Sequence, residues 1–173
     1  MNKSKIEIGI LGGSFDPAHK GHLAISKEAR KRFKLKKIIW AITKKNPLKA
    51  VSKTPVSKRI KDCKKLIGSN TFIKVKFYED IINSNKTIDL INYLKKNKKL
   101  EIFFLMGADN LISFHKWHKS KLITEKCNII VFDRHGYKKN SLKSKTFKKL
   151  NNKTLTFVKF KKVNISSSQL RKI

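Results

Sequence analysis

Short apolar runs alternate along this chain with segments whose apolar residues recur every three or four positions. This alternation limits the possible folds more than any other feature of the sequence. A run of four to eight apolar residues bounded by turn residues predicts a buried strand, whereas spacings of three and four predict one buried face of a helix. The chain should therefore consist of strand–helix–strand units.

Strands are expected at 6–11, 38–42, 72–78, 100–106, 128–132 and 155–160. Helices are expected at 21–34 and 56–67, from Thr87 onward with Thr87 as the N-cap, in short pieces between strands four and five, and at 166–171. In the third strand Lys74 and Lys76 alternate with apolar residues, which is typical of an edge strand with one wet face. The polar segment 138–153 is expected to be mobile. The pattern predicts an α/β, Rossmann-like, doubly wound fold: a mostly parallel sheet with helices on both faces.

The chain has 173 residues, enough for one substantial core, so we expect a single domain spanning 1–173. It has no apolar stretch long enough to cross a bilayer and no cleavable apolar segment at its start, and we expect a cytoplasmic protein without a membrane partner. Cys63 and Cys127 fall in a helix and a strand and form no C-x-x-C pair, which favours reduced core thiols.

The formal charge of +32 raises the question of a nucleic-acid partner, because clustered lysines gain affinity by releasing counterions from a phosphate backbone. Only five of the 43 basic residues are arginines, and the lysines are spread over every segment rather than gathered in a base-reading element. We therefore expect nucleic-acid binding to be at most non-specific. The positive field should still draw anionic nucleotides toward a cleft.

The loop after the first strand reads GGSFDPAHKGH, residues 12–22, and ligands of such sheets bind at the carboxyl ends of the strands. Its glycines would let backbone N–H groups approach a phosphate. His19 and His22 are three residues apart at a helix start, where both imidazoles share one face and can donate to phosphate oxygens beside the helix dipole. Alternatively one histidine caps the helix, or the pair binds a metal. Zinc would need a third ligand that nothing nearby supplies, so we expect no metal site in the protein itself.

This segment is similar to the G-G-S-F-D-P-x-H-x-G-H signature of the adenylyltransferase superfamily, whose H-x-G-H histidines contact nucleotide phosphates. Residues 165–171, ISSSQLR, are similar to the second signature of that superfamily, I-S-S-T-x-I-R. The resemblance implies catalytic roles for His19, His22 and Arg171. It also implies nucleotide-binding roles for Gly12, Gly13, Ser14, Phe15, Ser166 and Ser167. Serine hydroxyls and a fork-shaped guanidinium suit a triphosphate.

Further segments resemble the nicotinate-nucleotide branch of the superfamily. Residues 46–49, NPLK, are similar to a loop in which a lysine faces phosphate. Lys49 is preferred here, although Lys44 and Lys45 stay open. Residues 86–89, KTID, are similar to a Y-T-I-D segment at the pyridine pocket, which implies a binding role for Thr87 besides capping.

Two more segments extend this resemblance. Residues 107–117 match a G-A-D-N...F-x-x-W pattern, which implies binding roles for Gly107, for Asp109 near the ribose and for Trp117 as a stacking ring. Residues 134–137, RHGY, are similar to an R-P-G-Y loop over adenine, which implies a binding role for Arg134. Here His135 replaces the proline.

The resemblance implies an enzyme that transfers the adenylyl group of ATP to nicotinate mononucleotide, giving nicotinate adenine dinucleotide and pyrophosphate in NAD biosynthesis. Mg²⁺ would be bound through the ATP phosphates. The alternatives are a phosphopantetheine adenylyltransferase or a cytidylyltransferase, and, outside enzymes, a basic nucleic-acid-binding protein on the same fold. ATP and nicotinate mononucleotide are the expected partners. The sequence leaves a homo-oligomer open.

Overall fold

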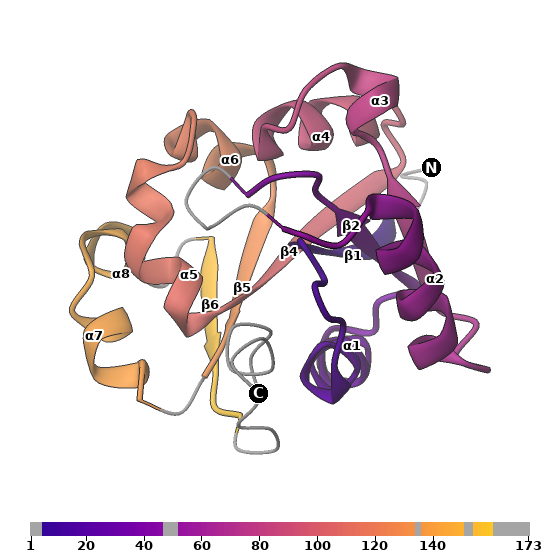
Figure 1. Cartoon of the computed structure of the whole chain (residues 1–173). Helices are drawn as coiled ribbons and strands as arrows, with labels where there is room; N and C mark the ends of the chain where they lie inside the picture. Colours follow the sequence, from indigo (N-terminus) through magenta and orange to yellow (C-terminus); the bar gives the residue numbers. More distant parts are fainter. Residues whose placement is uncertain (1–4, 47–51, 134–135, 151–153, 161–173) are drawn as a thin grey trace.

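The computed structural model describes residues 5–46, 52–133, 136–150 and 154–160. In these residues six strands form one sheet in the order β3-β2-β1-β4-β5-β6, and each of its five pairings is parallel. The strands are β1 (Ile6–Gly13), β2 (Lys37–Ile42), β3 (Ile73–Phe77), β4 (Leu100–Gly107), β5 (Asn128–Phe132) and β6 (Leu155–Val158). The strand order runs outward in both directions from β1 and β4 (Figure 1). The predicted doubly wound α/β fold is confirmed, with its topological switch point between those two strands.

The helices largely follow the predicted positions. They are α1 (Lys20–Phe33), α2 (Val56–Ile67), α3 (Glu79–Ile82), α4 (Thr87–Leu94), α5 (Ala108–Ser113), the 3-10 turn η1 (Phe114–Lys116), α6 (Ser120–Lys126), α7 (Lys138–Leu142) and α8 (Lys145–Leu150). One expectation was wrong. Thr87 is the first residue of α4 rather than its cap, and Lys86 occupies the N-cap without a side-chain capping bond. The polar segment 138–153 contains α7 and α8, and its mobility stays a prediction. The predicted helix at 166–171 lies outside the described residues.

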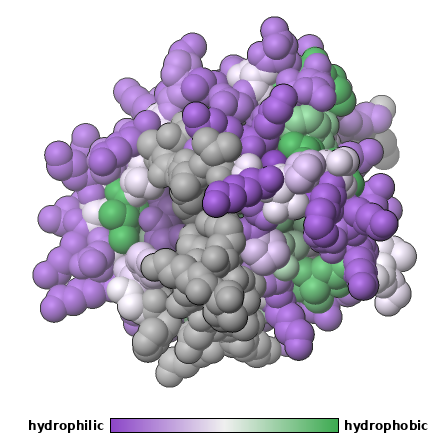
Figure 2. Space-filling view, in the orientation of Figure 1, coloured by the Kyte–Doolittle hydropathy of each residue, from purple (hydrophilic) through white to green (hydrophobic). Residues whose placement is uncertain are grey.

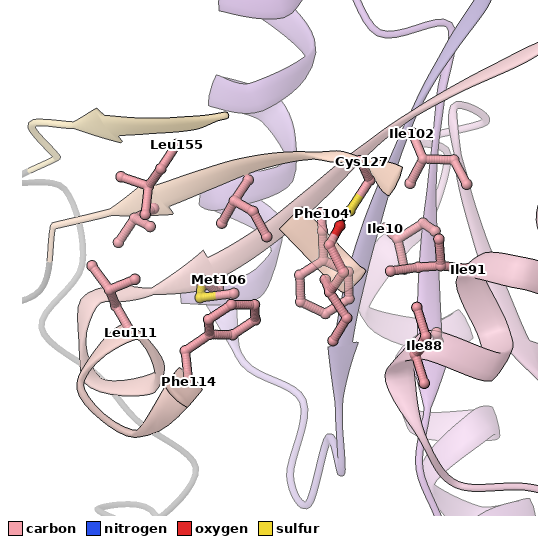
Figure 3. Close-up of a cluster of buried hydrophobic side chains, with 14 of the residues drawn as sticks. Ile10, Ile88, Ile91, Ile102, Phe104, Met106, Leu111, Phe114, Cys127 and Leu155 are labelled. Atoms are coloured by element: carbon pink, nitrogen blue, oxygen red, sulfur yellow. Dashed lines mark hydrogen bonds between the residues drawn. The ribbon is translucent and has the colours of Figure 1, made fainter. Parts of the chain in front are cut away.

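The core has two layers, one on each face of the sheet, because successive strand residues point to opposite sides. On one face Ile10 and Phe104 pack with α4, α5 and α6, including Ile91 (Figure 3). On the other face Trp40 and Leu105 pack with residues of α1 and α2. Both faces of the central strands are covered, which explains why their sequences are continuous apolar runs.

The third strand, β3, lies at one edge of the sheet, as predicted. Lys74 and Lys76 are exposed on it. Hydrophilic side chains cover most of the described surface in Figure 2, with small apolar patches between them. In the part of the chain that the structure describes, no helix has the length and apolar character needed to cross a membrane.

Both cysteines are buried free thiols, as the sequence predicted. Burial raises the pKa of Cys63 to about 12, and it does the same for Cys127. A thiol is much less reactive than its thiolate, so neither side chain is suited to nucleophilic chemistry at neutral pH.

Candidate active site

A cavity of about 310 Å³ opens at the carboxyl ends of β1, β2 and β4. This is the edge at which doubly wound sheets bind ligands, and it adjoins the switch point of this sheet. The cavity is lined by Gly12, Gly13, Ala41, Ile42, Thr43, Asn46, Tyr78, Glu79, Ile82, Ser84, Asn85, Lys86, Thr87, Leu90, Phe104, Asn110, Lys116, Trp117 and His118. Its volume suits a small-molecule ligand.

His19 and His22 form a reciprocal capping box at the start of α1. Nδ1 of His19 accepts from the backbone N–H of Gly21 at 3.1 Å, and Nδ1 of His22 accepts from the backbone N–H of His19 at 3.1 Å. The two ring centroids are 3.9 Å apart. A neutral imidazole that accepts at Nδ1 carries its proton on Nε2. Capping therefore fixes the tautomer of both rings and makes Nε2 the donor atom, so the capping and phosphate-binding alternatives are compatible.

Phe15 links these histidines to the cavity. Its ring lies against Gly13, which lines the cavity, and its centroid is 4.7 Å from that of His22 and 5.1 Å from that of Trp40. Phe15 has a φ of 50°, in the left-handed region that residues other than glycine seldom adopt. A side chain held in this region marks a backbone fixed by its surroundings, as is common at functional sites.

Arg59 on α2 is 2% exposed and donates hydrogen bonds to four carbonyl oxygens. Nη1 donates to Ser14 at 2.6 Å and to Thr43 at 2.8 Å, Nη2 to Lys44 at 3.4 Å, and Nε to Thr54 at 2.9 Å. Burial lowers the pKa of Arg59, while the nearby carboxylates of Asp16 and Glu79 raise it, with a lowered pKa as the net effect. An arginine keeps its charge even so. The sequence analysis did not identify this residue.

Two carboxylates flank the same loops. Glu79 accepts from the Thr43 hydroxyl at Oε1 and from the Lys44 backbone N–H at Oε2, 3.1 Å away. Asp16 is buried and accepts from the Ser52 hydroxyl. Burial raises the pKa of Asp16, but hydrogen bonds from Ser52 and Thr54 and the charge of Arg59 outweigh it, so its pKa lies below the ordinary value.

The predicted site residues fall into three groups. Gly12, Gly13, Thr87 and Trp117 line the cavity. Ser14, Phe15, His19, His22, Gly107 and Asp109 lie at the ends of β1 and β4 or in the helices that follow, at the same edge of the sheet. Lys49, Arg134, Ser166, Ser167 and Arg171 lie outside the described residues. The choice among Lys44, Lys45 and Lys49 therefore stays open.

Several functional candidates were not predicted. Tyr78 and Glu79 reach the cavity from the end of β3, and Ser84 and Asn85 from the turn before α4. Their positions depend on β3 lying next to β2, which no local pattern reveals. Among the described residues, no group of three or more His, Cys, Asp or Glu side chains is placed to hold a metal ion.

Comparison with known proteins gives a consistent set of relatives. A family model described as cytidylyltransferase-like matches residues 10–173. A probable nicotinate-nucleotide adenylyltransferase of Pelagibacter ubique is 67% identical over all of this chain and 96% of its own length. A protein of the same description from Agrobacterium fabrum is 38% identical over 75% of this chain and 70% of its own length.

A solved structure supports the fold at lower identity. Plasmodium falciparum nicotinic acid mononucleotide adenylyltransferase complexed with NaAD superposes with a TM-score of 0.79. The match covers 96% of this chain and 82% of that chain at 22% identity. It confirms the arrangement of strands and helices described above.

Proposed function

The chain belongs to the cytidylyltransferase-like family, and relatives that are 67% and 38% identical to it are described as probable nicotinate-nucleotide adenylyltransferases. We therefore propose that it transfers the adenylyl group of ATP to nicotinate mononucleotide. The products are nicotinate adenine dinucleotide and pyrophosphate, and the reaction is a step of NAD biosynthesis.

The observation that carries the proposal is that the histidine loop and the cavity share one edge of the sheet. Gly12 and Gly13 end β1 and line the cavity, and the same loop continues through Phe15 to the two histidines at the start of α1. A phosphate at this point would lie beside the cavity. Backbone N–H groups and the start of a helix favour an anion there.

The reaction is a direct displacement in which the 5′-phosphate of nicotinate mononucleotide attacks the α-phosphorus of ATP and pyrophosphate leaves. The nucleophile is already an anion, so the protein has to align the phosphates and stabilise the charge that develops on them. Nε2–H of His19 and of His22 would supply donors for the transferring phosphate. Arg171 and Lys49 would hold the leaving pyrophosphate, with Ser166 and Ser167 on the triphosphate and Arg134 near adenine.

The part of the cavity lined by Trp117 suits a pyridine ring with an acidic substituent. The Trp117 ring packs against Phe104, with centroids 5.9 Å apart, and against Phe114, with centroids 5.2 Å apart. Trp117 lines the cavity, where its indole would stack on the pyridine. Lys86 and Lys116 also line the cavity and give it a positive character that favours a carboxylate.

Magnesium fits this site as an ion carried by the nucleotide. Among the cavity-lining residues of the described chain, Glu79 is the acidic one, and both of its carboxylate oxygens already accept hydrogen bonds. Phosphate oxygens are the natural ligands of Mg²⁺, which keeps part of its water shell. Bound there, the ion would neutralise phosphate charge, while the chain's own residues orient the reactants.

Pyrophosphate release from ATP, measured with a panel of acceptors, tests the proposal. Nicotinate mononucleotide should support turnover, whereas phosphopantetheine and, with CTP as donor, sugar or polyol phosphates should not. Turnover with one of those acceptors in place of nicotinate mononucleotide would identify a different branch of the family. Tight duplex DNA binding at physiological salt without pyrophosphate release would favour the non-enzymatic alternative. The cytoplasmic location and any homo-oligomer stay predictions.

A further inference from the structure

Arg59 joins the loop after β1 to the connection between β2 and α2. Its guanidinium binds the carbonyl of Ser14 in the loop after β1, those of Thr43 and Lys44 after β2, and that of Thr54 just before its own helix. Burial of a charged group is costly unless its donors are satisfied, so these bonds hold the loops together as one unit. Arg59 itself is not among the residues that line the cavity.

The carbonyls bound by Arg59 determine where the neighbouring N–H groups point. In a planar trans peptide the C=O of one residue and the N–H of the next point in opposite directions. Binding the Thr43 carbonyl thus turns the Lys44 N–H away from the guanidinium, and this N–H meets Glu79 on the cavity wall. By the same geometry, the bonds to Ser14 and Lys44 turn the N–H groups of Phe15 and Lys45 away from Arg59.

The backbone conformation of Phe15 is a second, independent observation. Its φ of 50° is unfavourable for a side chain, and the peptide just before it is the one whose carbonyl forms the 2.6 Å bond with Arg59. Phe15 is 1% exposed, and its ring packs against both His22 and Trp40, whose rings also lie 5.9 Å apart, centroid to centroid. The loop is therefore fixed twice, by the packing of the Phe15 ring and by the bond from the Arg59 guanidinium to the Ser14 carbonyl.

We propose that Arg59 is a positioning residue for adenylyl transfer: it holds the loops after β1 and β2 so that the N–H groups of Phe15 and Lys45 are presented to the reacting phosphates. The inference rests on the proposed function. It assigns no contact between Arg59 and substrate. Arg59 would affect the reaction by orienting backbone N–H donors. Such donors stabilise the charge that develops in the transition state only if they are already correctly oriented.

Substitution of Arg59 should lower kcat more than it changes KM. Arg59→Lys keeps the charge but not the planar fork that reaches several carbonyls at once, and Arg59→Gln removes the charge. We expect kcat per folded molecule to fall about 10- to 100-fold in both variants, because small misplacements of aligned groups have effects of this size. KM for nicotinate mononucleotide should change less than about threefold. Lys58→Gln, on the exposed side of the same helix, is the matched control and should keep wild-type turnover.

Wild-type pyrophosphate release is measured first, since its absence would reject the proposed function rather than this inference. If the wild type turns over, wild-type kcat in folded Arg59→Lys and Arg59→Gln would overturn the positioning role. A change confined to KM would do so as well. Guanidinium added to Arg59→Ala should restore turnover at least fivefold, whereas ammonium at equal ionic strength should not. Equal effects of the two cations would count against the role.

The orientation of the Phe15 N–H can also be tested by NMR on the wild-type chain, so that this test does not depend on the folding of a variant. The sequence contains two Ser-Phe pairs, at 14–15 and 113–114. Labelling serine with ¹³C at the carbonyl and phenylalanine with ¹⁵N therefore selects two amide signals, those of Phe15 and Phe114. Titration with pyrophosphate should shift the Phe15 signal, while the signal of buried Phe114 stays in place as an internal reference. Saturating pyrophosphate that moves neither signal, or both equally, would contradict the proposed presentation of the Phe15 N–H.

Discussion

The two nitrogen atoms of His22 have separable tasks, and two substitutions can test them one at a time. Nδ1 accepts the capping bond from the His19 N–H at 3.1 Å, and Nε2 carries the proton that would be donated to phosphate in the proposed reaction. In His22→Asn the side-chain oxygen falls close to the position of Nδ1, so the variant keeps the cap and loses the donor. In His22→Gln the side-chain nitrogen falls near Nε2, so the variant keeps a donor and loses the capping acceptor.

The two variants should therefore lose different properties, His22→Asn its turnover and His22→Gln part of its stability. His22→Asn should lower kcat about 10²- to 10³-fold, the usual effect of removing one donor that stabilises developing charge, and should leave the free energy of unfolding nearly unchanged. His22→Gln should keep kcat within about tenfold of wild type and should cost about 1 kcal/mol of unfolding free energy, the usual contribution of one hydrogen bond, because the N-cap N–H of His19 loses its acceptor.

Steady-state pyrophosphate release with both substrates saturating gives kcat, and urea unfolding gives the stability. His115→Asn is the matched control, because His115 is exposed on η1 and outside the cavity lining. A folded His22→Asn enzyme with kcat within threefold of wild type would refute the donor role. Equal kcat losses in the Asn and Gln variants would show that catalysis follows the helix cap rather than the donor atom.

Three further outcomes are expected. Nicotinate mononucleotide should be used at least about tenfold more efficiently than its amide counterpart by kcat/KM, because an amide loses a charge-assisted bond and leaves a donor unsatisfied. Equal kcat/KM values would show that the chain does not belong to the nicotinate-specific branch. Neutralising Lys61 and Lys65, which are exposed on α2, should leave turnover unchanged at moderate salt, because charge is screened there beyond about 8 Å. A loss of turnover that persists in high salt would contradict this. Since burial raises the pKa of Cys63 and Cys127 to about 12 from 9.0, their thiolate fraction at pH 8 is about 1,000-fold lower than for a free thiol. A thiol reagent at pH 8 should therefore label them only after unfolding, and fast labelling of the native protein would contradict this. The free energy of unfolding should fall above pH 9, because the thiols ionise there in the unfolded state and not in the folded state.

The strands were predictable because burial on both faces leaves a direct mark on the sequence. Runs such as 100–106 and 128–132 contain almost no polar residue, and the structure places each in a strand with the same bounds to within one residue. The short helices α7 and α8 carry no comparable apolar period. They depend on packing against α5 and η1, so the polar sequence alone gave no reason to expect them.

The sequence predicted those residues of the site that belong to a recognisable motif. It did not reveal residues whose hydrogen-bond partners lie far away in the sequence. Arg59 donates to a carbonyl 45 positions earlier in the chain, and Glu79 accepts from a hydroxyl 36 positions earlier. Such bonds depend on the order of strands, which hydrophobic periodicity does not encode. One signal was present: Arg59 is the arginine of a helix whose other basic residues are all lysines, and a guanidinium is suited to binding several carbonyls at once.

The exposed lysines of β3 bear on how this sheet ends. A free strand edge offers unpaired N–H and C=O groups to any neighbouring strand, and adding such a strand is the first step of aggregation. Two copies meeting at this edge would bring Lys74 and Lys76 of each chain close together, and like charges directly opposite each other repel. The charges of the two ammonium groups therefore oppose the addition of a second copy's strand at β3. Some of the many lysines, which give little information about ligands, would therefore reduce aggregation at high protein concentration.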